Sequence, residues 1–444
     1  MSASVTDPLV EQLRAVAPTV DDPDICAAYG MDWTRRFAGP VRAVVRPTGV
    51  AEVAAALRVC SAAAVPVVPQ GGNSSIVGGS VPGPADPPSV VMSLTGLDSL
   101  GPIEELGGSV TAGAGVTLAA LHAHAAGAGM VYGVDLAARD SATVGGTIAT
   151  NAGGIRVCAY GMTRAQVLGV ECVLSDGSVL SRLVGLPKDN TGYDFGSLMA
   201  GSEGTLGVIT AARLRLRPAP PPTMVMMTGV RDLGAALELA RASVPAGGTL
   251  LGAEVVDAEG MRMVCDFIGE SAPVAGDFPY LLLVEATELD PPDGVEGVFG
   301  LDAPDRRRLW RYREDMSEAV SALGVAHKLD VSVPLANLDE MADGVRGLVP
   351  PTARVSVFGH LADGNLHIEI TGADPEDEAL DRAIFDLATG LGGAVSAEHG
   401  VGRAKSSWLG LSRSEAEIDA MRRIKTALDP AGILNPGALL PPVR

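Results

Sequence analysis

The chain lacks the sequence features of a membrane-spanning or exported protein. Although 47% of its 444 residues are hydrophobic, the apolar residues are dispersed, and no run is long enough to span a bilayer. The first residues, MSASVTDPLVEQLRAV, carry acidic side chains early and no basic segment before an apolar one, so we expect no signal peptide. The five cysteines are scattered without C-x-x-C spacing, which predicts a reduced, cytoplasmic protein.

A basic charge and the common nucleotide-binding motifs are also missing. The net charge of −20 argues against a nucleic-acid partner, although local positive charge can still bind an anionic substrate. No G-x-x-x-x-G-K-[ST] segment occurs. The stretch TAGAGVTL, 111–118, begins like G-x-G-x-x-G, but Leu118 occupies the third glycine position and the acidic ribose ligand is absent. These absences exclude a standard NAD-binding or P-loop protein.

The length and the order of the expected elements predict an α+β protein with more than one domain. A chain of 444 residues is too long for a single hydrophobic core. Short strand-like runs fill the first half, and both helical and strand patterns follow it. The proline-rich stretch RPAPPPT, 217–223, is the best linker candidate. We therefore expect domains at 1–217 and 218–410, followed by a C-terminal segment at 411–444.

Two glycine-rich segments lie in the first half of the chain. They are PVVPQGGNSSIVGGSVP, 66–82, and DSATVGGTIATNAGG, 140–154. Glycine lets the backbone approach a ligand closely, and successive backbone N–H groups form concavities that bind anions. Both segments therefore suit a pyrophosphate, and the alternative is that they are ordinary tight turns. Two such loops, each next to a strand, favour a nucleotide cofactor.

Two of the six histidines flank an Asp-Gly turn in FGHLADGNLHIEI, 358–370. A two-residue turn at Asp363-Gly364 predicts a β-hairpin in which His360 lies directly opposite His367. Directly opposed residues share a face of the sheet, with Cβ atoms about 4.5–5.5 Å apart. Two imidazoles at this spacing can bind one metal ion, and the alternative is a hydrogen-bonded pair at a strand end.

Several separate motifs resemble one flavoprotein superfamily. PQGGNSSIVGGSVP, SATVGGTIATNAGG and GSEGTLGVIT (201–210) resemble the FAD-binding segments of the vanillyl-alcohol oxidase / p-cresol methylhydroxylase superfamily. HLADGNLH, SAEHGVG (396–402) and LDPAGILNPG (428–437) resemble the C-terminal domain of its D-2-hydroxyacid dehydrogenase branch. The match runs in order from Asp32 to Gly437. It implies an α+β fold with a two-part FAD-binding domain of the vanillyl-alcohol oxidase type and an α+β substrate domain with an antiparallel sheet.

The resemblance implies non-covalent FAD, because no histidine lies in the first glycine loop to suggest a covalent link. That loop would hold the pyrophosphate, the second segment would lie along the flavin, and the C-terminal tail would return to the flavin. The implied cofactor-binding residues are Pro69, Gln70, Gly71, Gly72, Asn73, Ser74 and Ser75 in the first loop, Ser141, Gly145, Gly146, Asn151, Gly153 and Gly154 in the second, Gly204, Val208 and Ile209 on the adenine and ribose side, and Asn435 in the tail.

The resemblance also implies a divalent metal, with zinc as the first expectation. Members of the branch bind the ion through the two histidines of H-x-G-D-G-N-x-H and the glutamate of S-A-E-H-G, which are His360, His367 and Glu398 here. Two imidazoles and a carboxylate with open positions form a catalytic kind of site. The metal would acidify the substrate hydroxyl, and His399 would be the general base that takes its proton. Hydride would then pass to the flavin.

The implied substrate-binding residues point to a second carboxylate on the substrate. Arg313, in LWRYREDMSEAV (309–320), matches the arginine that binds the distal carboxylate of 2-hydroxyglutarate, and Ser317 lies one helical turn later on the same face. Lys328 matches a further cationic position. The alternatives are a surface salt bridge for Arg313 and a solvated lysine. Glu369 departs from the branch, which has asparagine there, and it brings negative charge to the place where an anionic substrate should sit. The alternatives are that Glu369 is protonated, binds the metal or points away.

The resulting hypothesis is an FAD- and metal-dependent D-2-hydroxyacid dehydrogenase, most similar to the 2-hydroxyglutarate branch. D-malate and D-lactate are the alternative substrates. An ether-lipid synthase of the same superfamily, a non-catalytic flavin-binding protein and a zinc hydrolase are the alternative functions. The expected electron acceptor is an electron-transfer flavoprotein or a quinone, and a homodimer is the oligomeric state that the resemblance suggests.

Overall fold

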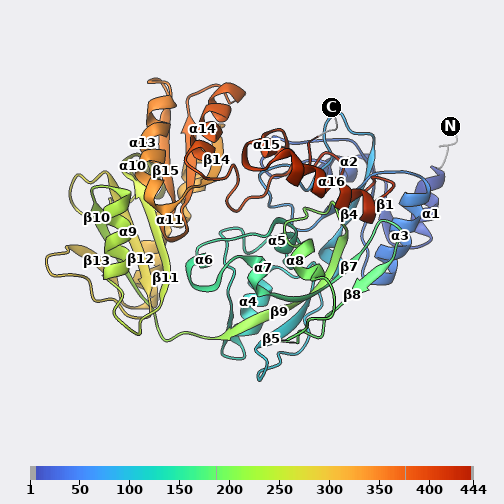
Figure 1. Cartoon of the computed structure of the whole chain (residues 1–444), viewed down its shortest axis with the longest axis horizontal. Helices are drawn as coiled ribbons and strands as arrows, with labels where there is room; N and C mark the ends of the chain where they lie inside the picture. The colour runs from blue at the N-terminus through green and yellow to red at the C-terminus, as the bar shows by residue number, and fades with distance from the viewer. Residues whose placement is uncertain (1–6, 187, 376, 442–444) are drawn as a thin grey trace. The chain divides into compact units, whose positions relative to one another are not determined.

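The computed structural model describes residues 7–186, 188–375 and 377–441, and it divides the chain into two compact units. The first unit comprises Met1–Gly153, Gly161–Ala219 and Glu398–Arg444, and the second comprises Gly154–Tyr160 and Pro220–Ala397. In Figure 1 the blue and teal elements other than α6 and the red C-terminal helices belong to the first unit, and α6 and the yellow and orange elements belong to the second. One junction lies inside the proline-rich linker RPAPPPT.

Two more junctions enclose Gly154–Tyr160, and the last lies between Ala397 and Glu398, whereas the substrate domain was expected to end at 410. The carboxylate of Glu203 explains the difference. It accepts hydrogen bonds from the backbone N–H groups of Val401 and Gly402, at 2.8 and 2.7 Å, and so ties this segment to the first unit. Residues 1–6 begin the segment in which we expect no signal peptide, and they lie outside the described residues.

A four-stranded sheet forms the N-terminal part of the first unit. Its elements are α1 (Pro8–Arg14), β1 (Thr19–Val20), α2 (Pro23–Tyr29), β2 (Val41–Val45), α3 (Val50–Ala62), β3 (Val67–Gln70), β4 (Ser89–Ser93) and the 3-10 helix η1 (Leu94–Gly96). The strand order is β1-β2-β4-β3, in which β2, β4 and β3 are parallel. Helix α3 joins β2 to β3, and its buried residues Val53, Ala56, Leu57 and Cys60 recur at helical spacing.

A five-stranded antiparallel sheet forms the second part of this unit. Its elements are β5 (Ser109–Gly113), α4 (Leu118–Ala126), β6 (Met130–Tyr132), α5 (Val144–Thr150), α7 (Thr163–Gln166), β7 (Val167–Val173), β8 (Val179–Ser181), α8 (Phe195–Met199) and β9 (Val208–Pro218). The order is β5-β9-β7-β8, and β6 also pairs with β9. One hydrophobic core joins both sheets, with Val67 and Val90 from the first and Val110 and Leu214 from the second. This is the two-part arrangement expected for the FAD-binding domain.

The C-terminal segment completes the first unit. It contains the 3-10 helix η4 (Ser406–Trp408), α15 (Leu409–Ser412) and α16 (Glu415–Leu428). Helix α16 begins with a capping box in which Ser414 and Glu417 exchange hydrogen bonds between side chain and backbone. After it, Leu434 forms a parallel bridge to Val67, and both Ile433 and Leu434 are buried in the core.

The second unit is built on a seven-stranded antiparallel sheet with the order β13-β10-β12-β11-β15-β16-β14. Its strands are β10 (Met224–Val230), β11 (Leu250–Asp257), β12 (Tyr280–Ala286), β13 (Gly297–Gly300), β14 (His327–Ser332), β15 (Arg354–His360) and β16 (Asn365–Thr371). Its helices are α6 (Val157–Tyr160), α9 (Leu233–Ala242), α10 (Ala258–Ile268), α11 (Ala303–Glu314), α12 (Met316–Ala322), η2 (Leu335–Asn337), α13 (Leu338–Leu348), η3 (Leu361–Asp363) and α14 (Glu378–Gly390). This sheet confirms the expected α+β substrate domain.

Helices α10, α11 and α12 pack on the face of this sheet that carries Phe358, where Met261, Trp310 and Met316 are buried with it. Within the ranges that the structure describes, no helix is long and apolar enough to cross a membrane.

The hairpin at β15 and β16 forms, but the predicted register is wrong by two residues. His360 pairs with Asn365, and Phe358 pairs with His367. The turn is longer than the predicted two residues because η3 occupies Leu361–Asp363, and Gly364 then takes a left-handed conformation with φ 81°. A shift of two keeps every side chain on its predicted face of the sheet. His360 and His367 are therefore diagonal neighbours, with ring centroids 5.3 Å apart.

Candidate active site

The two glycine-rich segments lie against each other in the first unit. A Cβ atom at Gly72 would come within 1.6 Å of the carbonyl oxygen of Ser141, and one at Gly71 within 2.3 Å of Oγ1 of Thr143. Only glycine permits this approach of one backbone to the other. Asn73 follows with φ 52°, and its side-chain amide donates to the carbonyl of Met31. The loop thus presents a backbone-lined surface of the kind that binds phosphates.

The other residues implied for FAD surround these loops or begin the adjoining elements. Gly145 and Gly146 lie in the first turns of α5, Asn151 ends that helix with φ 51°, and Gly204 precedes β9 with φ 72°. Three of the expected side chains are engaged within the protein, and one expected glycine lies outside this unit. Gln70 donates to the carbonyls of Tyr29 and Ser80, Val208 and Ile209 are buried in the core, and Gly154 belongs to the second unit.

Asn435 contacts the first glycine-rich segment and has an open hydrogen-bonding position. Its side-chain N–H groups donate to the carbonyls of Gly79 and Glu203, at 2.8 and 2.7 Å. The side chain is buried, yet its Oδ1 atom has no hydrogen-bond partner within the described residues. A buried amide oxygen normally accepts a hydrogen bond, so this atom is suited to a donor from a bound molecule.

Glu203 is a residue of this unit that sequence reasoning missed. It is buried, has φ 50°, and its two carboxylate oxygens receive the N–H groups of Val401 and Gly402. Burial raises the pKa of Glu203 above its ordinary value, against the opposing effect of these hydrogen bonds and of Lys405. The residue therefore anchors the backbone that directly follows Glu398 and His399. A charged residue inside the glycine-rich motif GSEGTLGVIT was the available signal.

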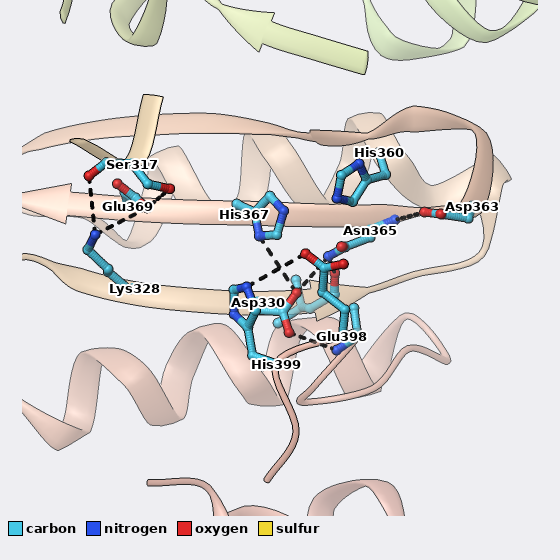
Figure 2. Close-up of polar contacts among 12 residues, drawn as sticks. Ser317, Lys328, Asp330, His360, Asp363, Asn365, His367, Glu369, Glu398 and His399 are labelled. Atoms are coloured by element: carbon cyan, nitrogen blue, oxygen red, sulfur yellow. Dashed lines mark hydrogen bonds and ion pairs between the residues drawn. The ribbon is translucent and has the colours of Figure 1, made fainter. Parts of the chain in front are cut away.

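In the second unit, polar side chains form a row on one face of β16. Asn365, His367 and Glu369 alternate along the strand, and all three are buried. Figure 2 shows them in a line, with Asp330 and Lys328 on the neighbouring strand β14. Asp330 pairs with His367, and Lys328 pairs with Glu369. Buried polar groups are costly unless they are hydrogen-bonded or bind a ligand, so such a row indicates a functional surface.

The structure brings the three expected metal ligands together. One ligand atom from each of His360, His367 and Glu398 lies within 4.8 Å of the others. Glu398 directly follows Ala397, whose N–H donates to Oδ2 of Asp330 at 3.1 Å. Two imidazole nitrogens and one carboxylate are a ligand set that suits zinc and other divalent transition metals.

A second grouping involves the same region. Ligand atoms of Asp330, His367 and His399 also lie within 4.8 Å of one another. Asp330 was not among the predicted ligands. It is fully buried, accepts from the side-chain amide of Asn365 at 2.8 Å, and lies 3.7 Å from Nδ1 of His367. Nε2 of His399 lies 3.6 Å from Glu398. The aspartate in HKLDVSVP was visible in the sequence, but its pairing with His367 depends on the β14–β16 register.

Glu254 is the most consequential residue that the sequence did not reveal. It lies on β11, directly across from His360 on β15. Its Oε1 atom is 2.8 Å from Nδ1 of His360, and its Oε2 atom accepts from Nε of Arg313 at 2.8 Å. An acidic residue in the middle of the apolar strand LLGAEVVD was the available signal, because a buried carboxylate requires partners.

The three residues implied for the far end of the substrate are near one another. Arg313 is buried and its guanidinium lies 4.9 Å from the ring centroid of Phe358, so it does not form the alternative surface salt bridge. Lys328 donates to Oγ of Ser321 at 2.9 Å, and its side chain is only 18% exposed. The expected single helix that carries Arg313 and Ser317 is divided at Asp315, which ends α11 and begins α12.

Glu369 contacts these residues. Its Oε1 atom lies 3.4 Å from Oγ of Ser317 and 3.8 Å from Nζ of Lys328. Burial raises the pKa of Glu369 to about 7, and Lys328, Ser317 and Arg313 oppose the rise. The Oε2 atom is buried and has no hydrogen-bond partner in the described part of the chain. The carboxylate therefore lies beside the proposed substrate-binding residues, and it is absent from both metal-ligand groupings.

Comparisons with known proteins agree across the chain. A family model described as "FAD binding domain" matches residues 41–181, and one described as "FAD linked oxidases, C-terminal domain" matches residues 219–439. The chain is 37% identical to a mitochondrial D-2-hydroxyglutarate dehydrogenase of Bos taurus, over 97% of this chain and 82% of the relative. It is 36% identical to a D-2-hydroxyglutarate dehydrogenase of Xanthomonas citri pv. viticola, over 98% of this chain and 97% of the relative.

Solved structures share the fold at much lower identity. An alkyldihydroxyacetonephosphate synthase aligns with a TM-score of 0.72 and 16% identity, covering 98% of this chain and 86% of the other. A p-cresol methylhydroxylase with substrate bound aligns with a TM-score of 0.72 and 15% identity, covering 97% and 95%. At this identity the likeness is one of fold alone, and it agrees with the expected vanillyl-alcohol oxidase type of architecture.

Proposed function

Since the chain belongs to the family of FAD-linked oxidases that includes the D-2-hydroxyglutarate dehydrogenases, we propose that it oxidises a D-2-hydroxyacid to the 2-oxoacid, with D-2-hydroxyglutarate as the first candidate. The observation that carries this proposal is the gathering of His360, His367 and Glu398 within 4.8 Å. D-Malate and D-lactate are alternatives within the same class. The two adjacent glycine loops argue against a zinc hydrolase, because a hydrolase function would not explain the loops.

The residues present fit both implied groups. The glycine loops and the open Oδ1 atom of Asn435 suit FAD, and the two imidazoles and one carboxylate of His360, His367 and Glu398 suit a divalent metal, with zinc proposed. When bound, FAD supplies a hydride acceptor and the metal supplies Lewis-acid chemistry at the substrate hydroxyl. His360, His367 and Glu398 would hold the metal. Other residues of the chain would bind the substrate and take its hydroxyl proton.

We assign those remaining roles to four residues. The imidazole of His399 takes the proton of the C2 hydroxyl, and the carboxylate of its neighbour Glu398 lies 3.6 Å from Nε2. Arg313 and Lys328 bind the far end of the substrate, since both cations are largely buried on the same face as His367. Ser317 adds a hydroxyl beside them. Holding the substrate at both ends fixes C2 relative to the base.

The remaining proposals concern the surroundings of the enzyme. We propose an electron-transfer flavoprotein or a quinone as the acceptor that reoxidises the flavin, and a homodimer as the oligomeric state. We also propose a cytoplasmic location, which the five free cysteines support because such thiols persist in a reducing compartment.

The test is turnover with an artificial electron acceptor. We expect purified protein to release FAD on denaturation and to convert D-2-hydroxyglutarate, but not its L-enantiomer, to 2-oxoglutarate with reduction of the dye. D-Malate and D-lactate, tested alongside, rank the alternatives. Turnover of none of the three D-hydroxyacids by protein that contains FAD and metal would contradict the proposed reaction and favour a non-catalytic flavin-binding protein.

A further inference from the structure

The carboxylate of Glu369 occupies the region assigned to the far end of the substrate. It lies directly across from Lys328 in the β14–β16 register, and its Oε1 atom is 3.8 Å from Nζ of that lysine. Oγ of Ser317 is 3.4 Å from the same oxygen. Figure 2 shows Ser317, Lys328 and Glu369 as one group beside His367. Two of the three proposed substrate-binding residues therefore already contact a carboxylate of the protein.

The cation at the third position is paired as well. Nε of Arg313 donates to Oε2 of Glu254 at 2.8 Å, and only 9% and 1% of these two side chains are exposed. The region thus contains two cations, each with its own carboxylate, and the four charges sum to zero when all are ionised. A second substrate carboxylate would add a third negative charge at low dielectric, which is repulsive unless a further cation is present.

One atom of Glu369 is open to a ligand. Oε2 is buried and accepts no hydrogen bond from any residue that the structure describes. A buried carboxylate oxygen gains stability from a donor, and leaving it without one costs free energy. A substrate group that carries N–H or O–H would supply that donor, whereas a carboxylate would place a second acceptor against it.

We propose that Glu369 is the specificity-determining residue of this site, and that it favours D-2-hydroxyacids whose far end is an uncharged hydrogen-bond donor over those that end in a second carboxylate. This inference rests on the proposed function, because it takes Arg313 and Lys328 to face the far end of the substrate. D-2-Hydroxyglutarate is still oxidised, since Arg313 has four N–H donors besides the one that Glu254 accepts. The enzyme binds D-2-hydroxyglutarate with lower affinity than it binds a neutral analogue of the same length.

The matched pair of substrates is D-2-hydroxyglutarate and its 5-amide, which have nearly the same shape and differ in charge and donor groups. We expect kcat/KM of the wild-type enzyme to be about tenfold higher for the amide, mainly through KM. Glu369→Asn and Glu369→Gln should shift the ratio toward the diacid by about tenfold or more, because they remove the negative charge. A general loss of folding would lower kcat/KM for both substrates by the same factor and would leave the ratio unchanged.

The control is Glu285→Gln, which removes another buried carboxylate of the same sheet. Glu285 accepts from Nε1 of Trp310 at 2.7 Å and pairs with Arg156, away from Glu369. Its substrate ratio should equal that of the wild type. Glutarate and glutaramate, which lack the hydroxyl, provide a second measurement on the wild-type enzyme alone, and glutaramate should be the stronger competitive inhibitor.

Each outcome decides the inference. If the wild-type enzyme prefers the diacid and the Glu369 variants keep that preference, the assigned role of Glu369 is wrong, although the proposed dehydrogenase function stands. If protein loaded with FAD and metal oxidises neither compound, the inference and the proposed function fail together.

Discussion

Glu254 Oε1 lies 2.8 Å from Nδ1 of His360, across two neighbouring strands of the seven-stranded sheet. Because Glu254 also accepts from Arg313, its carboxylate is held as an acceptor, and Nδ1 of His360 carries the hydrogen. Nε2 of His360 then keeps the lone pair that a metal requires. One buried carboxylate thus orients both a proposed metal ligand and a proposed substrate-binding residue.

Glu254→Gln should weaken metal binding by about 10–100-fold, the usual effect of changing the partner of a ligating histidine. Glutamine has one acceptor oxygen where two donors require acceptors, so either His360 or Arg313 loses its partner. The measurement is a titration of the purified apoprotein with zinc against a competing chelator. KM for the hydroxyacid should rise as well. Glu285→Gln, the buried-carboxylate control, should keep the wild-type metal affinity, and equal metal affinity in Glu254→Gln would show that this contact is only structural.

Removing a ligand should have a larger effect than removing its partner. His367→Asn should reduce zinc affinity by more than about 100-fold, while FAD content stays unchanged. The matched control is His327→Asn, since His327 is also buried on this sheet but contacts Asp381 and the carbonyl of Asp374, both at 2.7 Å. We expect that variant to lose stability and to keep its metal. Full metal content in His367→Asn, measured by atomic emission, would contradict the assignment.

The glycine loops give a prediction for the cofactor. Gly72→Ala places a methyl group 1.6 Å from the backbone oxygen of Ser141, so the first loop must move away from the second segment. We expect FAD affinity to fall by at least about tenfold, measured by flavin fluorescence on titration of the apoprotein. Gly49→Ala is the control, because nothing lies within 4 Å of the added atom and its φ of −157° suits alanine. Equal FAD affinity in both variants would contradict the proposal that this loop binds the pyrophosphate of FAD.

Glu203 gives a pH dependence with a definite sign. Burial raises the pKa of Glu203 above the ordinary value of 4.5, so the folded protein keeps a proton that the unfolded chain releases. The stability of the folded state therefore falls as pH rises through the window between the ordinary and the raised pKa. Relative to Glu203→Gln, which does not titrate, the wild type should lose up to about 1.4 kcal/mol per pH unit in that window. Thermal unfolding midpoints of both proteins from pH 4.5 upward test this, and a difference that is constant or of opposite sign would contradict it.

The sequence predicted those parts of the site that depend on neighbouring residues in the chain. Gly71 and Gly72 could be assigned to a close backbone approach because glycine is required there by sterics alone. The face shared by His360 and His367 could also be predicted, since alternation along a strand does not depend on the length of the turn. The register of the β15–β16 hairpin could not be predicted, because η3 adds residues to the loop that a two-residue Asp-Gly turn would not contain.

The contacts that were missed all join residues far apart in the chain. Glu254 meets Arg313 and His360 only when β11 lies beside β15, and Asp330 meets His367 only in the β14–β16 register. No local pattern encodes those pairings. The break at Asp315 was missed for a related reason, since both flanking segments have helical sequences and the division depends on how α11 and α12 pack on the sheet.

The most direct test of the central claim is anaerobic reduction of the bound flavin by D-2-hydroxyglutarate, followed by its absorbance, with and without prior removal of metal by a chelator. We predict rapid loss of the oxidised-flavin absorbance in the untreated protein, no loss after chelation, and recovery on adding zinc. Equally rapid reduction after the metal is removed would contradict the role of His360, His367 and Glu398. A flavin that D-2-hydroxyglutarate, D-malate and D-lactate all fail to reduce would contradict the proposed reaction itself.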